Sequence, residues 1–353
     1  MLDTTTKDIK YNFSKIFWIF FGALLAIPID LAEGLFFAYF QIIFLFLITK
    51  KLSELKLILV LFYVSIVLVS TFYGSDQRLV SLINPTMLAL VFLIEFKDSE
   101  KINLIFKGMY FSLTLLSIYM IYLFSKIGFT SYYALLNSRE WASDDVSFFG
   151  NGLAILISFL FVKATKESKY IYALLFFVVG VLTTSRIPIY TAFFILIFYL
   201  IKSLGSFTNI MRFILLTTLI LIFASYTGLI EELSSLSERI LGTSDRVDVY
   251  TLAFNTFLDN PFLGIGAERL PYFLHAHNSY LQVLVKYGIF AFIIWLTLIY
   301  FVFFTGYKYF SNLDFIFTFF IISMAQIGLH HPNAILIILL YVSYLQSSKK
   351  INV

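Results

Sequence analysis

Apolar segments long enough to cross a membrane recur along the whole sequence, and they restrict the fold more than any other feature. A hydrocarbon core about 30 Å thick needs roughly 20 predominantly apolar residues in a helix. Backbone polar groups must be hydrogen-bonded within lipid, so these segments are expected to be helical. The sequence therefore predicts an all-α, polytopic membrane protein with about 12 transmembrane helices, near residues 16–29, 32–49, 55–73, 79–96, 103–125, 148–162, 170–184, 188–201, 211–229, 279–304, 313–329 and 333–346.

The composition agrees with this class. Only 13% of the residues are charged and 60% are hydrophobic, whereas a soluble domain carries about 25% charged residues. The absence of cysteine excludes disulfides, thiol catalysis and cysteine metal sites. We expect one integral membrane domain over residues 1–353, with an uncleaved first helix that ends at Pro28. The runs on either side of Arg186 form one broken helix or two helices, because Pro188 disfavours helix at the preceding residue.

Basic residues predict the orientation. With both termini in the cytoplasm, every cytoplasmic loop carries lysine or arginine, as the positive-inside rule requires. Of the 18 lysines, only Lys126 and Lys286 then fall outside. Six of the seven arginines fall on or near the outer face, which favours recognition of oxyanions there, although chance in a small sample gives the same pattern. These are Arg78, Arg139, Arg186, Arg239, Arg246 and Arg269.

Two outer segments exceed a simple turn. Residues 126–147 are expected to form a loop, and residues 230–278 a large periplasmic loop between the ninth and tenth spans. In the large loop, apolar spacing predicts a short amphipathic helix that ends at Gly242. A second helix is expected from about 243–245 to Asn260-Pro261. Its expected apolar face comprises Val247, Tyr250, Phe254 and Phe257.

The sequence HAHNSY concentrates the polar candidates of the large loop. His275 and His277 precede a long apolar helix for which Asn278 or Ser279 is a suitable N-cap. The positive end of the helix dipole keeps a nearby imidazole neutral and able to accept a proton. Free N–H groups at the same helix start are a potential anion site. The alternatives are a loop-bonded histidine or a zinc site, and no third zinc ligand is evident.

Arginines supply candidate anion contacts. Arg186 lies between two apolar runs, where a charge is costly unless it faces a polar cavity or snorkels to the interface. Arg246 opens the second loop helix, and a solvated ion pair with a neighbouring aspartate is the simpler interpretation. Arg269 and Arg139 are weaker candidates.

Three other groups are open alternatives. Asp30 and Glu33 in the first outer loop are either a catalytic carboxylate pair or ordinary loop charges. A second pair, Asp144-Asp145, is a divalent-cation site or a solvated turn. Histidines 330 and 331 border the same cavity or simply form the last outer turn.

Taken together, these motifs resemble the bacterial O-antigen ligase and polymerase superfamily of membrane glycosyltransferases. The similarity covers mainly residues 180–292. It consists of Arg186 after a Thr/Ser pair, Arg246 opening a loop helix, the turn N-P-x-x-G-x-G at 260–266, and H-x-H-N-x-Y-L-Q from residue 275.

The ligase pattern of that superfamily is His-[Asn/Ser/Gln], nine residues, then Gly-x-x-[Gly/Thr/Tyr]. It corresponds here to His277-Asn278 and Gly288. The sequence departs at the last place, where Ala291 stands; a small residue is expected to serve similar packing.

The resemblance implies a GT-C-like helical bundle with the active site facing the periplasm across the bacterial inner membrane. It implies metal-independent transfer of a glycan from undecaprenyl pyrophosphate, with no cofactor. His277 would serve as base, and Arg186 and Arg246 would bind the pyrophosphate. His275, Asn278, Tyr280, Arg269 and Arg139 would support the substrate.

We expect an O-antigen polymerase that joins two undecaprenyl-pyrophosphate-linked repeat units and works with a chain-length regulator, among membrane lipids and without nucleic acid. The alternative in the same class is an O-antigen ligase, whose acceptor is lipid A-core. A lipid-linked oligosaccharide flippase or other transporter is the rival from another class, and it predicts charges at the bilayer midplane and paired broken helices.

Overall fold

The computed structural model shows a helical protein. It describes residues 2–26, 30–32, 35–49, 54–73, 80–94, 98–137, 146–182, 186–203, 244–266 and 278–304, with single positions between 211 and 218 and between 318 and 323.

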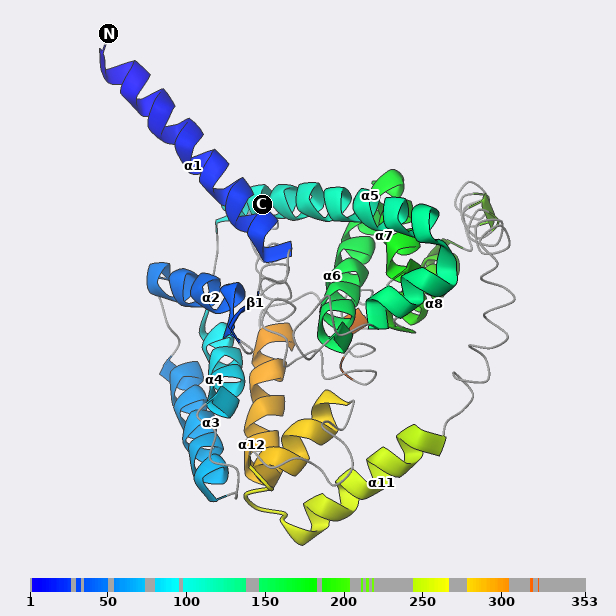
Figure 1. The fold of residues 1–353 in the computed structure, drawn as a ribbon. Coiled ribbons are helices and arrows are strands. Elements are labelled where there is room, and N and C mark those ends of the chain that lie inside the picture. The colour runs from blue at the N-terminus through cyan, green and yellow to red at the C-terminus, as the bar shows by residue number, and fades with distance from the viewer. Residues whose placement is uncertain are drawn as a thin grey trace.

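The described residues are almost entirely helical, as expected (Figure 1). By length and composition, three helical stretches among them could cross a membrane, namely Glu54–Phe72, Ser99–Lys126 and Ser279–Phe301, the last of which is interrupted at Gly288. This is consistent with a membrane protein, while the expected number of spans stays a prediction. The helices are α1 (Leu2–Ala26), α2 (Phe37–Ile48), α3 (Glu54–Tyr73), α4 (Val80–Leu93), α5 (Ser99–Asn137), α6 (Val146–Lys166), α7 (Tyr170–Leu182), α8 (Arg186–Ser203), α11 (Ser244–Asp259) and α12 (Ser279–Phe304).

Two boundaries differ from the expected ones. Strands β1 (Asp30–Ala32) and β2 (Leu35–Phe36) pair antiparallel, so helix α2 begins at Phe37 rather than near residue 32. Aspartate and glycine, present here at Asp30 and Gly34, are poor helix formers, which delays the helix. Helix α5 continues to Asn137, although a loop was expected from residue 126. Polar residues there lower the hydrophobicity without interrupting the backbone hydrogen bonds.

The crossing of α1 and α5 is held close by two glycines. A methyl group at Gly22 would overlap the carbonyl oxygen of Ile105, and one at Gly108 would overlap that of Ile19. Small residues allow helix backbones to approach in this way, and within lipid such contact replaces the missing hydrophobic drive for association. Figure 1 shows the N-terminal part of α1 extending beyond this crossing, away from the remaining helices.

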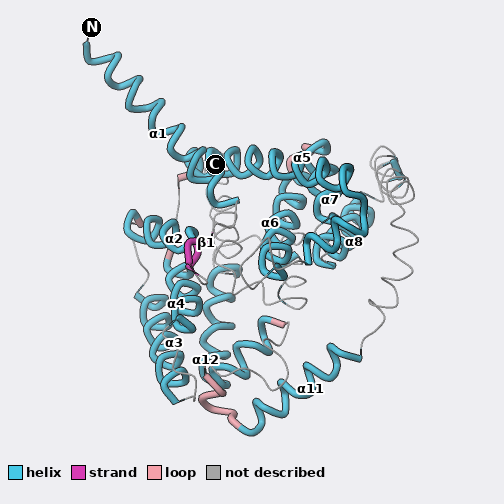
Figure 2. Tube along the Cα trace, viewed as in Figure 1, coloured by secondary structure: helices cyan, strands magenta, loops and turns pink. Residues whose placement is uncertain are grey.

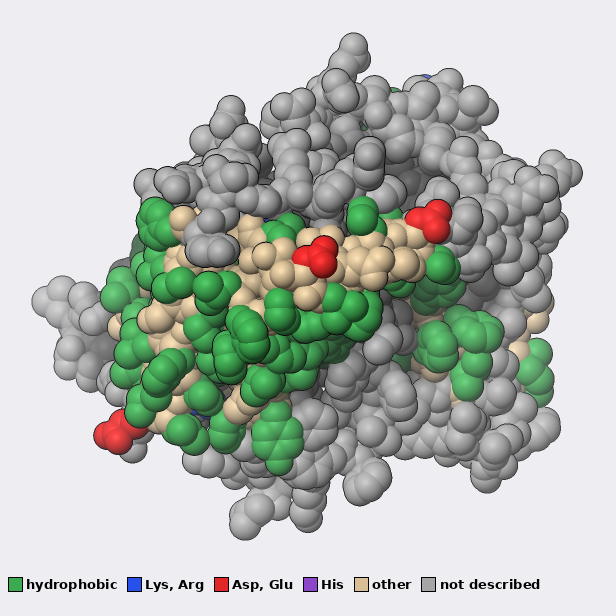
Figure 3. Space-filling model, turned by 90° about the horizontal axis from the view of Figure 1, so that it is seen from below, with side chains coloured by type: hydrophobic (Ala, Val, Ile, Leu, Met, Phe, Trp, Pro, Cys, Tyr) green, Lys and Arg blue, Asp and Glu red, His purple; other side chains and the backbone are tan. Residues whose placement is uncertain are grey.

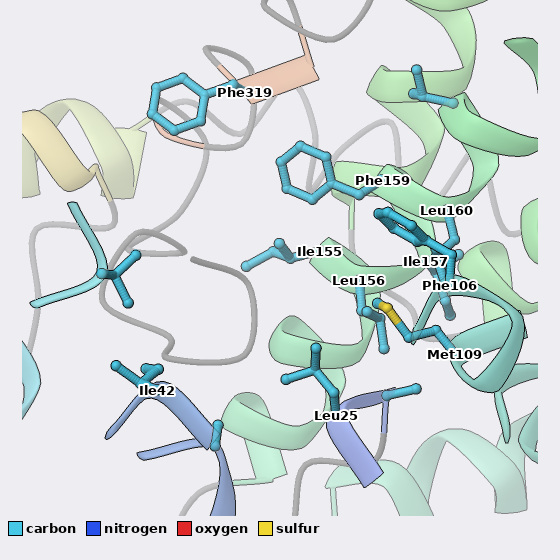
Figure 4. Packing of buried hydrophobic residues seen from close by; sticks show 14 of the residues in the cluster. Leu25, Ile42, Phe106, Met109, Ile155, Leu156, Ile157, Phe159, Leu160 and Phe319 are labelled. Carbon is cyan, nitrogen blue, oxygen red and sulfur yellow. The ribbon is translucent and has the colours of Figure 1, made fainter. Parts of the chain in front are cut away.

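Buried apolar side chains from helices far apart in the sequence meet in the core (Figure 4). Leu25 of α1, Ile42 of α2, Met109 of α5 and Leu160 of α6 are fully buried. Close packing of this kind makes the interior sensitive to changes of even one methylene. The core therefore holds α1, α2, α5 and α6 together.

A buried lysine lies at the α6–α7 turn. Lys163 is only 2% exposed; it forms an ion pair with Glu167, and its Nζ lies 4.5 Å from the centre of the Phe106 ring. Lys169 bonds the same carboxylate at 2.8 Å. Burial raises the pKa of Glu167, but the two ammonium groups lower it more, so the carboxyl stays below its ordinary pKa. The charges thus hold the two helices together at their turn.

We predict that Gly108→Val separates α1 from α5 and destabilises the protein by about 1–3 kcal/mol, the range for overpacking a tight site. Thermal unfolding of the detergent-purified protein measures this. Leu115→Val on the same helix is the control, because Leu115 is 54% exposed. Equal unfolding temperatures for the two variants would contradict the close crossing.

Candidate functional site

Helix α12 is divided at Gly288 into two arms. Gly288 has φ 75° and ψ −176°, which no helical residue adopts. The ring centres of Tyr280 and Trp295 are 5.4 Å apart, whereas a straight helix would separate these residues by about 22 Å. The first arm (residues 279–287) therefore folds back beside the second arm (residues 289–304), as Figure 1 shows at the yellow-to-orange junction.

The turn at residues 260–266 supplies hydrogen bonds to this break. The N–H groups of Ile265 and Gly266 donate to the carbonyls of Val285 and Lys286, at 2.9 and 2.8 Å. The N–H of Ile289 donates to the carbonyl of Pro261 at 2.9 Å. Figure 2 shows this turn as a loop at the junction of α11 and α12. Each arm is thus bonded at its broken end.

Three glycines make this fit possible. Gly264, Gly266 and Gly288 all have positive φ, which favours glycine. A methyl group at Gly288 would overlap the carbonyl of Phe262, and one at Gly266 would overlap the carbonyl of Ser70 in α3. Gly288 and Gly266 therefore allow the turn to pack in close contact with α12 and with α3.

The start of the first arm is capped by Asn278. Its Oδ1 accepts hydrogen bonds from the N–H groups of Tyr280 at 3.0 Å and Leu281 at 3.1 Å, and its carbonyl accepts from Gln282 N at 2.9 Å. Of the two residues suited to this position, Asn278 is the N-cap. The three N–H groups of Tyr280, Leu281 and Gln282 are therefore bonded within the protein, and an anion at this helix start stays a prediction.

Tyr280 joins the two arms. Its ring meets Trp295 edge-on and belongs to the partly buried shell of the core. A contact with the substrate stays a prediction for this residue. Ala291, at the last place of the ligase pattern, is fully buried, which confirms that a small residue packs there.

Helix α11 packs on the first arm through one face. It runs from Ser244 to Asp259, as expected. Val249 and Ala253 are buried, and Ala253 and Phe257 cluster with Leu281 and Val285 of the first arm and with Ile265 of the turn. Of the residues expected on the apolar face, Phe257 packs on the first arm, whereas Val247 and Phe254 are exposed.

Arg246 lies in the first turn of α11. It precedes Ala253, a residue of α11 that packs against the first arm, by seven residues of the same helix. The sequence interpretation of Arg246 as the opening residue of this helix is consistent with that position.

Arg186 lies at the start of α8, just after α7. Pro188 is the third residue of α8, and a methyl group at Gly180 in α7 would contact its ring. Residues eight apart in one continuous helix would be about 12 Å apart along the axis. The two helices therefore do not continue one another in a straight line, and Arg186 is the first residue of the second helix.

The other candidates lie outside the described residues. These are His275, His277, Arg269, Arg139, Glu33, Asp144, Asp145, His330 and His331, while Asp30 begins strand β1. The described part of the chain contains no group of three His, Asp or Glu side chains suited to a metal ion. The roles assigned to these residues stay predictions.

Comparison with known families finds a match to the part of the chain that contains the turn at 260–266 and the broken helix α12. Residues 171–296 match the sequence model of the O-antigen ligase family. This match supports a place for the protein in the O-antigen ligase and polymerase superfamily. No curated protein matches the chain. The matched O-antigen ligase segment begins in α7, contains α11 and the turn at 260–266, and ends in the second arm of α12.

Sequence reasoning missed the break within this O-antigen ligase segment. Gly288 lies inside an apolar run, so residues 279–304 were expected to form one continuous helix. The feature that could have indicated the break is Gly288 itself, which lies within the apolar run and follows the two glycines of the turn, Gly264 and Gly266. Glycine is costly in a helix interior unless the backbone needs it.

We predict that Gly288→Ala destabilises the O-antigen ligase segment, because a Cβ there meets the Phe262 carbonyl and requires a left-handed conformation. The conformational part alone costs roughly 1–2 kcal/mol. Thermal unfolding in detergent provides the measurement. Ile293→Ala, on the exposed side of the second arm, is the control, and an unchanged unfolding temperature for Gly288→Ala would refute the break.

A second prediction concerns the cap. Asn278→Ala should cost about 1 kcal/mol, the usual loss for an N-cap, whereas Asn278→Asp should retain the two bonds. Amide hydrogen exchange at Tyr280 and Leu281 reports the change directly. Faster exchange in both variants would show that the Asn278 side chain has another role.

Proposed function

We propose that the protein is an O-antigen polymerase, a membrane glycosyltransferase that joins lipid-linked oligosaccharide repeat units on the periplasmic face. The observation that carries this proposal is the O-antigen ligase match over residues 171–296, which spans Arg186, Arg246 and the HAHN sequence. Similarity to this family supports a glycosyltransferase of the O-antigen class, acting on lipid-linked oligosaccharides.

The proposed reaction is a direct displacement at the anomeric carbon. A hydroxyl of the acceptor sugar attacks that carbon, a new C–O bond forms, and the bond to undecaprenyl pyrophosphate breaks. His277 accepts the hydroxyl proton. Arg186 and Arg246 stabilise the negative charge that develops on the leaving diphosphate, without a metal ion. Attack from the opposite side inverts the anomeric configuration.

Two features of the structure support this arrangement. Asn278, the residue that follows His277, is held in place by its two hydrogen bonds to the start of the first arm. Helix α11, whose first turn contains Arg246, packs against the same first arm. A rigid support of this kind serves a displacement reaction, because positioning of the reactants supplies much of the rate gain.

Two other functions are candidates: an O-antigen ligase and a transporter. The printed description of the family, O-antigen ligase, favours transfer of the finished polymer to lipid A-core as the second candidate. A transporter would be expected to have paired broken helices. Within the described residues α12 is broken at Gly288, and no second helix there has a non-helical residue in its interior.

His277→Ala and Arg186→Ala should each reduce polymer formation by about 10²–10⁴-fold, the usual range for loss of a general base or of an oxyanion contact. Ladders of surface polysaccharide on gels, at matched protein levels, measure this. Arg212→Ala, expected on the cytoplasmic side, is the control and should retain the full ladder. Normal ladders in both test variants would refute the proposed site.

Deletion of the gene separates the two enzyme functions. Lipopolysaccharide carrying one repeat unit on core indicates loss of a polymerase. Bare core, with polymer left on undecaprenyl pyrophosphate, indicates loss of a ligase and would overturn the polymerase proposal. An accumulation of unflipped repeat units on the cytoplasmic face would instead indicate a transporter.

A further inference from the structure

Helix α11 has three faces of different character. The packed face, with Val249, Ala253 and Phe257, contacts the first arm and the turn. A second face, the exposed apolar stripe, carries Val247, Phe254 and Leu258, which are 55%, 48% and 56% exposed.

The third face of α11 is polar. Asp248, Asn255 and Asp259 are exposed and, at seven and four residues apart, share one side of the helix. At 100° per residue, this polar face lies about 90° from the exposed apolar stripe. A helix in contact only with water would not carry such a stripe, and a helix covered by protein would not carry the polar face.

The exposed apolar stripe continues onto the surface of α12. Beyond the end of α11, Phe262 is 62% exposed and stacks on Phe290, with ring centres 5.8 Å apart. Phe290, Ile293 and Tyr300 form the exposed face of the second arm, within a candidate membrane span. Viewed from the side on which α11 lies, the molecule shows a broad field of hydrophobic side chains with acidic groups at separate points (Figure 3).

We infer that α11 is an interfacial helix whose exposed apolar stripe is covered by phospholipid acyl chains. Phe290 and Ile293 on the second arm would face lipid. Because Phe262 stacks on Phe290, the apolar surface is continuous, and the same lipid would extend over Phe262 to the stripe on α11. The polar face keeps Asp248 and Asp259 in water. A helix with an apolar face in the headgroup–acyl boundary and a polar face outside is the usual form of such an element.

This location sets the height of α11 relative to the bilayer. Its packed face holds the first arm, so the capped start of that arm is tied to a helix at the membrane surface. The inference does not depend on which glycosyl transfer the protein performs.

Spin labelling tests the inference, and the chain is suited to it because it contains no cysteine. Single cysteines at Val247, Phe254 and Leu258 probe the exposed apolar stripe, and those at Asp248, Asn255 and Asp259 are matched controls on the polar face. Each full-length variant is labelled and reconstituted in phospholipid nanodiscs. Collision rates with oxygen, which concentrates in lipid, and with a water-soluble nickel chelate are then compared.

We expect a higher oxygen-to-nickel collision ratio at all three positions of the stripe than at their polar neighbours. High nickel access at both faces would place the stripe in water and overturn the inference. Low access to both reagents at the stripe, with spin–spin broadening that disappears on dilution with unlabelled protein, would show a second copy of the chain instead. Agreement among three positions per face protects the result against one variant that fails to fold.

Discussion

The local structure of the site region depends on how the backbone is hydrogen-bonded at the break in α12. A break in an apolar helix exposes carbonyl and N–H groups, and in lipid each unsatisfied group costs several kcal/mol. The turn at residues 260–266 satisfies them through Val285, Lys286 and Ile289. Without that turn the first arm could not fold back, so the break and the turn must form together.

This pairing connects the elements around the candidate site. The turn is bonded to α12, meets α3 at Ser70, and follows directly from α11. α11 in turn packs on the first arm through Ala253 and Phe257. A change at one glycine of the turn would therefore displace three helices, and the Asn278 cap at the far end of the first arm would move with them.

The sequence predicted the helices and their ends better than the contacts between them. Helix α11 and its end before Asn260-Pro261, the cap at Asn278 and the end of α1 before Pro28 followed from local rules of capping and proline geometry. The superfamily was also predicted, from motifs that the family match contains. The break at Gly288, the change of helix direction before Arg186 and the split faces of α11 depend on contacts between distant residues, which hydrophobic periodicity does not encode. The assignments of His277, Arg186 and Arg246 stay predictions for the same reason.

The three faces of α11 also constrain how this region can change in length. One residue inserted before Ala253 would rotate everything after it by about 100°. Phe254 and Leu258 would turn toward water, and Asp259 would turn toward the first arm. Seven inserted residues would restore all three faces to within about 20°. Homologous chains should therefore vary in loop length on either side of α11, while within it insertions and deletions should be confined to whole pairs of turns.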